Sequence, residues 1–354
     1  MSTVQSTLNR INDSNLSTPA ILIAILVALD GFVWWLNIPF VEDIFTVATI
    51  TLIMVLGFQM FMGNSGILSW SYVGFVGIGA FVSAILSTPV EYKAVQYRFM
   101  YQVLVDVHLP FVPALICGGL FAALVAAIVS WPMMRLTDSV GAIAQFSLLI
   151  VIHVLLAQWG EVTNGPRTFT LGTTRITNIW IALFVAVLVI IVAYSFKESS
   201  LGLKLRASRD DRHAARSSGI NIIAVRYYSY IASAFIGGIA GGLYSHYIMS
   251  ITASAFYMNS LFVLLTMSVI GGSMSISGVF FGTLLVTFVQ KGLQQLEFIL
   301  SRDWHLEASG TTDIVLSLLM IAFLILMPNG ISSGRELNLK ALTGLRRRRK
   351  GEIQ

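Results

Sequence analysis

Long apolar segments constrain this chain more than any other feature of its sequence. A bilayer core about 30 Å thick needs about 20 mostly apolar residues per helix. Segments of that length, separated by polar or Gly- and Pro-rich breaks, fall near 19–36, 41–62, 67–87, 111–130, 140–159, 178–196, 227–249, 258–275, 279–297 and 312–327. Backbone groups in hydrocarbon must be satisfied internally, and the sequence lacks the short alternating segments of a β-barrel. We therefore expect an all-α, polytopic membrane protein with about ten transmembrane helices.

Composition supports the same class. Of the 354 residues, 56% are hydrophobic and only 11% are charged, against about 25% charged in an average soluble domain. A soluble protein of this length could not hide so much apolar surface from water. The polar N-terminus leads into an apolar segment without a small-residue cleavage motif, so we expect no cleaved signal peptide. Three parts are predicted: a cytoplasmic N-terminal segment (1–18), a transmembrane domain (19–330) and a basic cytoplasmic tail (331–354).

Basic residues predict the orientation, because cytoplasmic loops carry an excess of Lys and Arg. The loop 197–226 has a net charge of +4, and the stretch 335–354 has a net charge of +5. With ten helices and a cytoplasmic N-terminus, both regions fall inside, and the acidic loop 297–311 falls outside. We expect a bacterial inner (plasma) membrane protein with both termini in the cytoplasm. The tail would contact anionic membrane lipid, and nucleic acid is not an expected partner.

Groups that could carry chemistry are scarce in the apolar segments. Asp30 lies in the first and Lys291 in the ninth. The sequence has no P-loop, no metal-spaced His/Cys cluster and no nucleophile–base pair. We therefore predict no catalytic residue, no metal site and no cofactor in this chain, so any ATP would be bound by another chain. A transporter powered by ATP on another chain is one interpretation of such a protein. An ion-coupled secondary transporter is the alternative, although such carriers often need buried carboxylates or broken helices.

Two glycine-rich runs interrupt the apolar segments, at residues 63–69 and 271–278. Small residues let helices pack closely, and this is the expectation for Gly74, Gly77, Gly237, Gly241 and Gly282. The two runs also bring hydroxyl and amide groups to helix ends. Irregular backbone at membrane depth is tolerated only within protein or along a wet cavity. A substrate pathway is therefore the second interpretation, and its candidate residues are Asn64, Ser65, Ser69, Gly271, Gly272 and Ser273.

The stretch 208–221 is too polar to span a membrane. Asp210 or Asp211 could cap a short helix that Ala214 and Ala215 continue, and Gly219 could end it. Such a helix would present a small knob to a cytoplasmic partner. An ordinary solvated loop that carries positive charge explains the pattern equally well.

This stretch resembles a known family. The motif Ala214-Ala215-x-x-x-Gly219 is similar to the Glu-Ala-Ala-x-x-x-Gly coupling signature of ABC importer permeases, with His213 in place of Glu. The fuller run at 209–221 resembles the M-type permease subunit of branched-chain amino acid uptake systems (LivM-type). Runs at 66–81, 163–165, 240–244 and 271–282 extend the resemblance over roughly 45–330. The chain departs from the family pattern at Ile67, Ser71 and Tyr72, and over 132–160.

The resemblance implies a permease without its own ATPase. Its partners would be a second homologous permease, two cytoplasmic ATPase subunits that bind ATP and Mg²⁺, and a periplasmic solute-binding protein. The substrate would be a branched-chain amino acid or a related small solute, such as an amide, urea or an aromatic acid, because the departures fall near the predicted pathway. The residues implied to form the ATPase-coupling loop are Asp211, His213, Ala214, Ala215 and Gly219.

Overall fold

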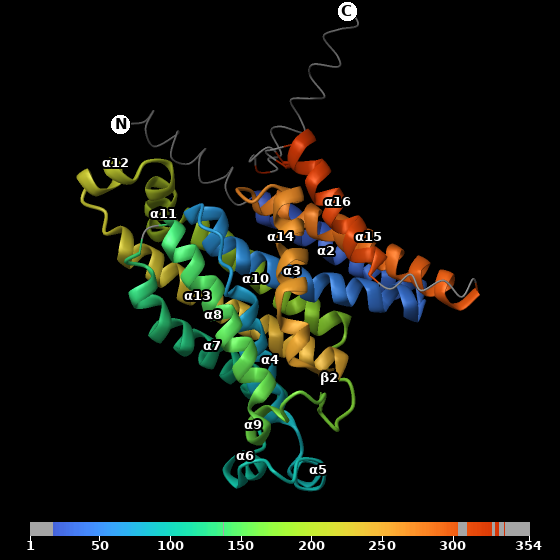
Figure 1. The fold of residues 1–354 in the computed structure, drawn as a ribbon. Coiled ribbons are helices and arrows are strands. Elements are labelled where there is room, and N and C mark those ends of the chain that lie inside the picture. The colour runs from blue at the N-terminus through green and yellow to red at the C-terminus, as the bar shows by residue number, and fades with distance from the viewer. Residues whose placement is uncertain (1–16, 137, 304–309, 328–329, 333–335, 337–354) are drawn as a thin grey trace, which may run out of the picture.

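The computed structural model describes residues 17–136, 138–303, 310–327, 330–332 and 336. Ten of its helices coincide with the ten apolar segments (Figure 1): α2 Ser17–Leu36, α3 Pro39–Ser65, α4 Tyr72–Ser87, α7 Phe111–Met133, α8 Asp138–Gln158, α10 Ile179–Glu198, α13 Ile222–Ile248, α14 Met258–Gly271, α15 Ile276–Asp303 and α16 Thr311–Leu326. The shorter elements are α5 Val90–Gln96, α6 Gln102–Asp106, α9 Gly160–Thr163, α11 Ser200–Asp210, α12 Arg212–Ser217, the 3-10 helix η1 Ala253–Phe256, and the paired strands β1 Phe169–Thr170 and β2 Ser250–Ile251.

Within the described residues, eight helices are long and apolar enough to cross a membrane, or nine if α4 and α5 form one bent span. The all-α, polytopic prediction is confirmed, with fewer full-length spans than the ten segments suggested. Helix α4 stops at Ser87 because Thr88 is extended before Pro89, and the residue before a proline disfavours the helical conformation. Helix α16 has 16 residues, or about 24 Å, which is short of the hydrocarbon thickness.

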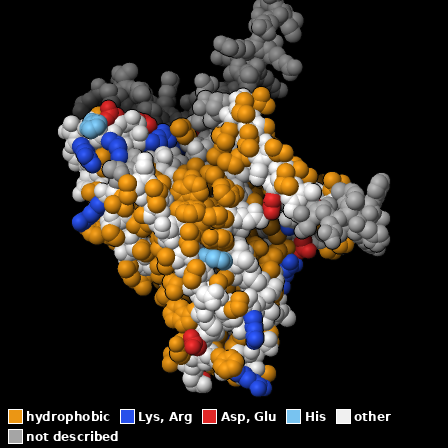
Figure 2. Space-filling model, viewed as in Figure 1, with side chains coloured by type: hydrophobic (Ala, Val, Ile, Leu, Met, Phe, Trp, Pro, Cys, Tyr) orange, Lys and Arg blue, Asp and Glu red, His pale blue; other side chains and the backbone are white. Residues whose placement is uncertain are grey.

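Helix α3 lies at the centre of the bundle. Its most apolar window is 83% buried, against 28% for α2 and for α8. It packs against α10, α13, α14 and α15. The outer helices leave large apolar side chains exposed, and Figure 2 shows hydrophobic side chains over much of the middle of one face. A lipid environment, in which these faces need no other cover, explains this arrangement.

Glycines bring α4 and α13 into close contact. A Cβ added at Gly79 would lie 2.3 Å from the backbone of Gly238, and one at Gly241 would lie 2.0 Å from the carbonyl oxygen of Val76. Backbones can approach this closely only where side chains are absent. The close-packing interpretation is confirmed here, and it also holds for the glycines at 74, 77, 237 and 282, whose added Cβ would lie 2.4–3.0 Å from a neighbouring atom.

The bundle has two distinct ends (Figure 1). We call the end formed by α11 and α12 the basic end, and the end formed by α5, α6 and the β1–β2 pair the hairpin end. At the hairpin end, Arg175 pairs with Asp43 at 2.9 Å and lies 3.8 Å above the ring of Tyr247. These contacts tie the first turn of α3 to the last turn of α13. The predicted N-terminal segment up to residue 16 and the tail from residue 337 lie outside the described residues.

Candidate functional site

A capped helix, α12, forms the tip of the basic end. The Asp211 carboxylate accepts hydrogen bonds from the backbone N–H groups of His213 (2.8 Å) and Ala214 (3.0 Å). These bonds hold the pKa of Asp211 below its ordinary value. Gly219 has φ +79°, and the N–H groups of Gly219 and Ile220 bond to the carbonyls at 216 and 215 in a Schellman motif. The predicted short helix is confirmed, with Asp211 as its cap.

The two predicted alanines of α12 face different ways. Ala215 is buried, whereas Asp211, His213, Ala214 and Gly219 are exposed. Helix α12 packs against α11 and α13, so its inner face is held by the bundle. Its outer face exposes His213 and Arg216 beside the small side chain of Ala214, and no atom lies within 4 Å of a Cβ added at Gly219. The structure therefore favours a protruding short helix over an ordinary solvated loop for the stretch 208–221.

Arg209 joins this end to the centre of the bundle. Its guanidinium donates a hydrogen bond of 2.8 Å to the carbonyl oxygen of Gly63, in the last turn of α3. Its side chain also lies against Gly66, where a Cβ would come within 2.7 Å of Arg209 Cγ. Gly66 caps α3 with φ +70°. The segment that carries α12 is thus in direct contact with the break between α3 and α4.

The two predicted glycine-rich runs lie side by side at the basic end. The Gln59 side-chain amide donates to the carbonyl oxygen of Ser273 at 3.2 Å. A Cβ at Gly63 would lie 2.2 Å from the same oxygen. The break between α3 and α4 therefore touches the break between α14 and α15. Sequence reasoning singled out both runs but did not predict that they meet.

The polar side chains of the first run serve the local backbone. Asn64 donates to the Met60 carbonyl at 2.9 Å, Ser65 accepts from the N–H of Ile67 at 3.1 Å, and Ser69 is buried. Ser65 also lines a pocket of about 330 Å³ beside Arg209.

In the second run, Gly271 packs against Gly278, whose carbonyl oxygen would lie 2.3 Å from an added Cβ. Gly272 has φ +101°, which favours glycine. Ser273 contributes its carbonyl to the contact with Gln59. All six candidate pathway residues thus gather near the basic end, and their role as a substrate pathway stays a prediction.

At the basic end, an ion pair that sequence reasoning missed joins α10 to the start of α15. The Lys197 ammonium, at the end of α10, bonds to Glu336 at 2.5 Å and to the Met274 carbonyl at 2.8 Å. Glu336 also accepts from the N–H groups of Ile276 (2.8 Å) and Ser277 (3.1 Å) at the start of α15. The sequence offered no local signal for a pair separated by 139 residues.

Glu336→Gln is expected to lower the stability of this region by about 2–4 kcal/mol, because it leaves the mostly buried Lys197 without a counter-charge. Burial raises the pKa of Glu336, but Lys197 and the two N–H groups outweigh it, so the pKa lies below 4.5. The stabilisation is therefore present above about pH 4.5 and lost as pH falls through the native pKa. Thermal unfolding in detergent as a function of pH measures both effects.

The matched control is Glu198→Gln. Glu198 is more exposed and lies 3.7 Å from Arg206, so its loss should cost less than about 1 kcal/mol. Equal melting temperatures for Glu336→Gln and the unmodified protein between pH 6 and pH 8 would show that the pair does not stabilise the fold.

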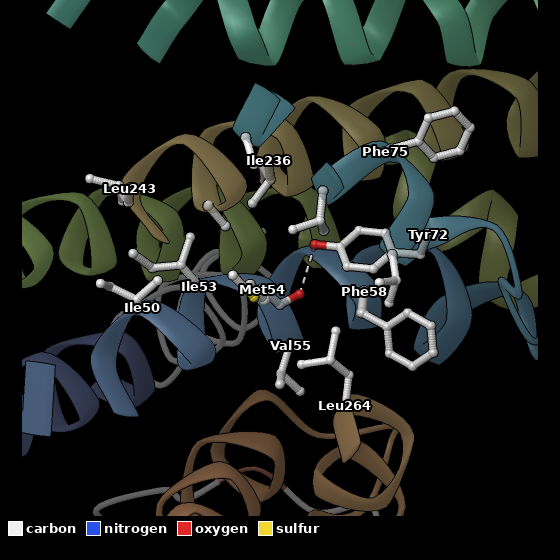
Figure 3. Close-up of a cluster of buried hydrophobic side chains, with 14 of the residues drawn as sticks. Ile50, Ile53, Met54, Val55, Phe58, Tyr72, Phe75, Ile236, Leu243 and Leu264 are labelled. Atoms are coloured by element: carbon white, nitrogen blue, oxygen red, sulfur yellow. Dashed lines mark hydrogen bonds between the residues drawn. The ribbon is translucent and has the colours of Figure 1, made fainter. Parts of the chain in front are cut away.

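A cluster of large buried side chains packs along α3 and the start of α4 (Figure 3). The hydroxyl of Tyr72 donates to the Met54 carbonyl at 2.7 Å, and the Tyr72 ring lies 5.4 Å from that of Phe58. Ser71 hydrogen-bonds the hydroxyl of Tyr230. Ser71 and Tyr72, which depart from the pattern of the family that the sequence resembles, are thus buried packing residues where α4 begins.

Comparison with known proteins decides what kind of bundle this is. The profile of a family described as "Branched-chain amino acid transport system / permease component" matches residues 40–324. The chain belongs to this family. The predicted resemblance is therefore confirmed, and the chain is a multi-pass permease component of a transport system, which does not itself catalyse a reaction.

Named relatives agree with this assignment. The high-affinity branched-chain amino acid transport system permease protein LivM of Escherichia coli K12 is 25% identical over 336 residues, covering 85% of this chain and 72% of the relative. A probable LivM of Methanocaldococcus jannaschii is 30% identical over 187 residues, covering 50% of this chain and 54% of the relative. The probable LivH permease of the same organism is 22% identical over 246 residues, covering 65% and 76%. No solved structure matches this chain.

Proposed function

We propose that this permease is the membrane-spanning subunit of an ATP-binding-cassette importer for a branched-chain amino acid or a related small solute. The observation that carries the proposal is the capped helix α12, which protrudes at the basic end and is joined through Arg209 to the break between α3 and α4. A protruding helix of one or two turns with an exposed outer face suits docking into a partner's groove. Family membership and the names of the relatives supply the substrate class.

The proposed assembly contains chains that this permease would need. Two cytoplasmic ATPase subunits would bind ATP and Mg²⁺, a homologous permease would pair with this one, and a periplasmic protein would deliver the solute. The basic end would face the cytoplasm of a bacterial cell, since the loop 197–226 carries a net charge of +4. Both termini would then be cytoplasmic, with membrane lipid around the bundle and no role for nucleic acid.

Movement would pass from α12 to the bundle through contacts at the basic end. ATP binding to the partners would displace α12 and, with it, α11. Arg209 would carry the displacement to Gly63, and the contact of Gly63 and Gln59 with Ser273 would carry it to the second break. Two breaks that share one contact can open together, which is what a gate between α3 and α15 requires.

Co-purification and transport assays test this function. The chain is expressed with candidate ATPase and solute-binding subunits, purified and placed in proteoliposomes with labelled L-leucine. Uptake that needs ATP and the binding protein is expected. Uptake that ignores ATP and follows a proton or sodium gradient would instead support the ion-coupled alternative, and the importer proposal would be abandoned.

Changes in α12 sharpen the test. Ala215→Trp cannot fit the buried side of α12, and Gly219→Val strains a backbone with φ +79° by about 1–2 kcal/mol. Both variants are expected to insert normally and to lose at least about 90% of ATP-driven uptake, since a displaced α12 no longer meets the ATPase. Gly160→Val is the control, because no atom lies within 4 Å of its added Cβ. Normal uptake by both α12 variants would remove this helix from the mechanism.

A further inference from the structure

A cavity of about 200 Å³ lies between α3, α4, α14 and α15, on the hairpin side of the core cluster. Met54 and Leu264 line it and also belong to the buried cluster of Figure 3, so the cavity adjoins the core along α3. A water molecule's share of liquid volume is about 30 Å³. The cavity therefore has room for a solute of amino-acid size.

The cavity wall has one charged side chain. Lys291 of α15 lines it together with the side chains of Asn259 and Gln294. The Lys291 ammonium donates to the Gln294 amide oxygen at 3.2 Å and, among the described residues, makes no ion pair. The carboxylate of Asp43, which interacts with Lys291 electrostatically, is already bound by Arg175 at 2.9 Å.

The rest of the wall is mixed, and it includes the polar residues Thr51, Tyr244, Ser260 and Gln290. Its apolar part comes mainly from α3, α4 and the η1–α14 segment, where Val47, Val73 and Val263 line the cavity. A lysine that makes no ion pair inside a membrane protein is costly and usually has a function. Helix α15 supplies an ammonium and amides to the wall, and α3 and α4 supply branched apolar side chains. This combination matches a solute with a carboxylate at one end and an apolar group at the other.

We propose that this cavity binds the solute during transport, with Lys291 pairing the solute carboxylate and the valines contacting its apolar side chain. This inference rests on the proposed function and narrows it. Of the possible substrates, an amino acid or an aromatic acid fits, whereas urea and simple amides lack the group that Lys291 would bind. Lys291 is then a residue that determines specificity.

The site can be tested without ATP by measuring how well a bound solute protects an introduced cysteine from thiol labelling. Cys117 is the only cysteine of the chain, so Cys117→Ser removes the background. Ser260→Cys then places one thiol in the cavity wall, and Val263→Cys is the second reporter if the first folds poorly. The rate of labelling by a small neutral thiol reagent is measured in membranes that contain the full complex. L-leucine and isovalerate at saturation should slow labelling at least about fivefold, while leucinamide and urea should not.

Variants at 291 separate charge from packing. Lys291→Gln should raise the concentration of L-leucine needed for protection by about tenfold or more, and Lys291→Arg should retain protection. Gln295→Cys, an exposed position on the same helix, should label at one rate with every probe. Protection by leucinamide equal to that by L-leucine, unchanged protection in Lys291→Gln, or no protection by any probe would overturn the inference. Because labelling needs no ATP, these outcomes are distinct from uptake that ignores ATP, which would overturn the proposed function.

Discussion

Arg209→Met is expected to reduce ATP-driven uptake at least about tenfold while leaving the assembled complex intact. Arg209 carries the hydrogen bond from α11 to the Gly63 carbonyl, at 2.8 Å. A hydrogen bond to a charged group contributes about 1.5–3 kcal/mol, which corresponds to a factor of about 10–100. Methionine keeps the stem that packs against Gly66 but cannot donate. Movement of α12 would then no longer reach the break between α3 and α4.

The measurement is uptake per ATP hydrolysed in proteoliposomes. Hydrolysis is expected to continue while transport falls, because α12 itself is unchanged. Lys204→Met is the matched control: Lys204 lies on the same helix and is exposed, so the same loss of charge occurs without loss of the contact to α3. If Arg209→Met transports as well as Lys204→Met, the contact with Gly63 does not transmit the movement.

Gly79→Val is expected to abolish most of the folded protein. The added Cβ would lie 2.3 Å from both the Cα and the carbonyl oxygen of Gly238. Backbone atoms cannot move aside as a side chain can, so α4 and α13 must separate. Overpacking typically costs 1–3 kcal/mol and occasionally more, and here we expect more than about 3 kcal/mol. Against a total stability of about 5–15 kcal/mol, such a loss is large.

The fraction of monodisperse protein after detergent extraction and its melting temperature measure this effect. Gly292→Ala is the control, since nothing lies within 4 Å of a Cβ at that helical position. Alanine there should be neutral or stabilise by up to about 1 kcal/mol. A melting temperature for Gly79→Val within about 2 °C of the unmodified protein would show that α4 and α13 do not need this close approach.

The helices were predictable because lipid imposes a length and a polarity on each of them. The apolar segments 41–62 and 178–196 correspond to α3 and α10, and the Gly-broken stretch 258–297 correctly predicted the two helices α14 and α15. The bend of 107° after α4 was not predicted. The apolar pattern does not specify the angle between successive helices. Helix α4 ends because the residue before Pro89 disfavours the helical conformation.

Helix α12 follows from a different kind of signal. Its limits depend on contacts within a few residues: Asp211 bonds N–H groups two and three positions on, and Gly219 ends the helix through its own backbone conformation. Local signals of this kind can be read from sequence. The pattern left the exposure of Ala214 and the burial of Ala215 open, because these depend on α11 and α13.

By itself, the sequence determined the membrane class, the order of the helices and the family, and it offered the capped helix at the basic end as one of two equal interpretations. All of these rest on local composition, on capping or on motif order. Only the tertiary structure decided that Arg209 meets Gly63, that Glu336 meets Lys197, and that the two glycine-rich runs touch. The first two pairs are separated by 146 and 139 residues. Such partners are chosen by how helices pack, and close packing at glycines leaves no periodic pattern that identifies the partner.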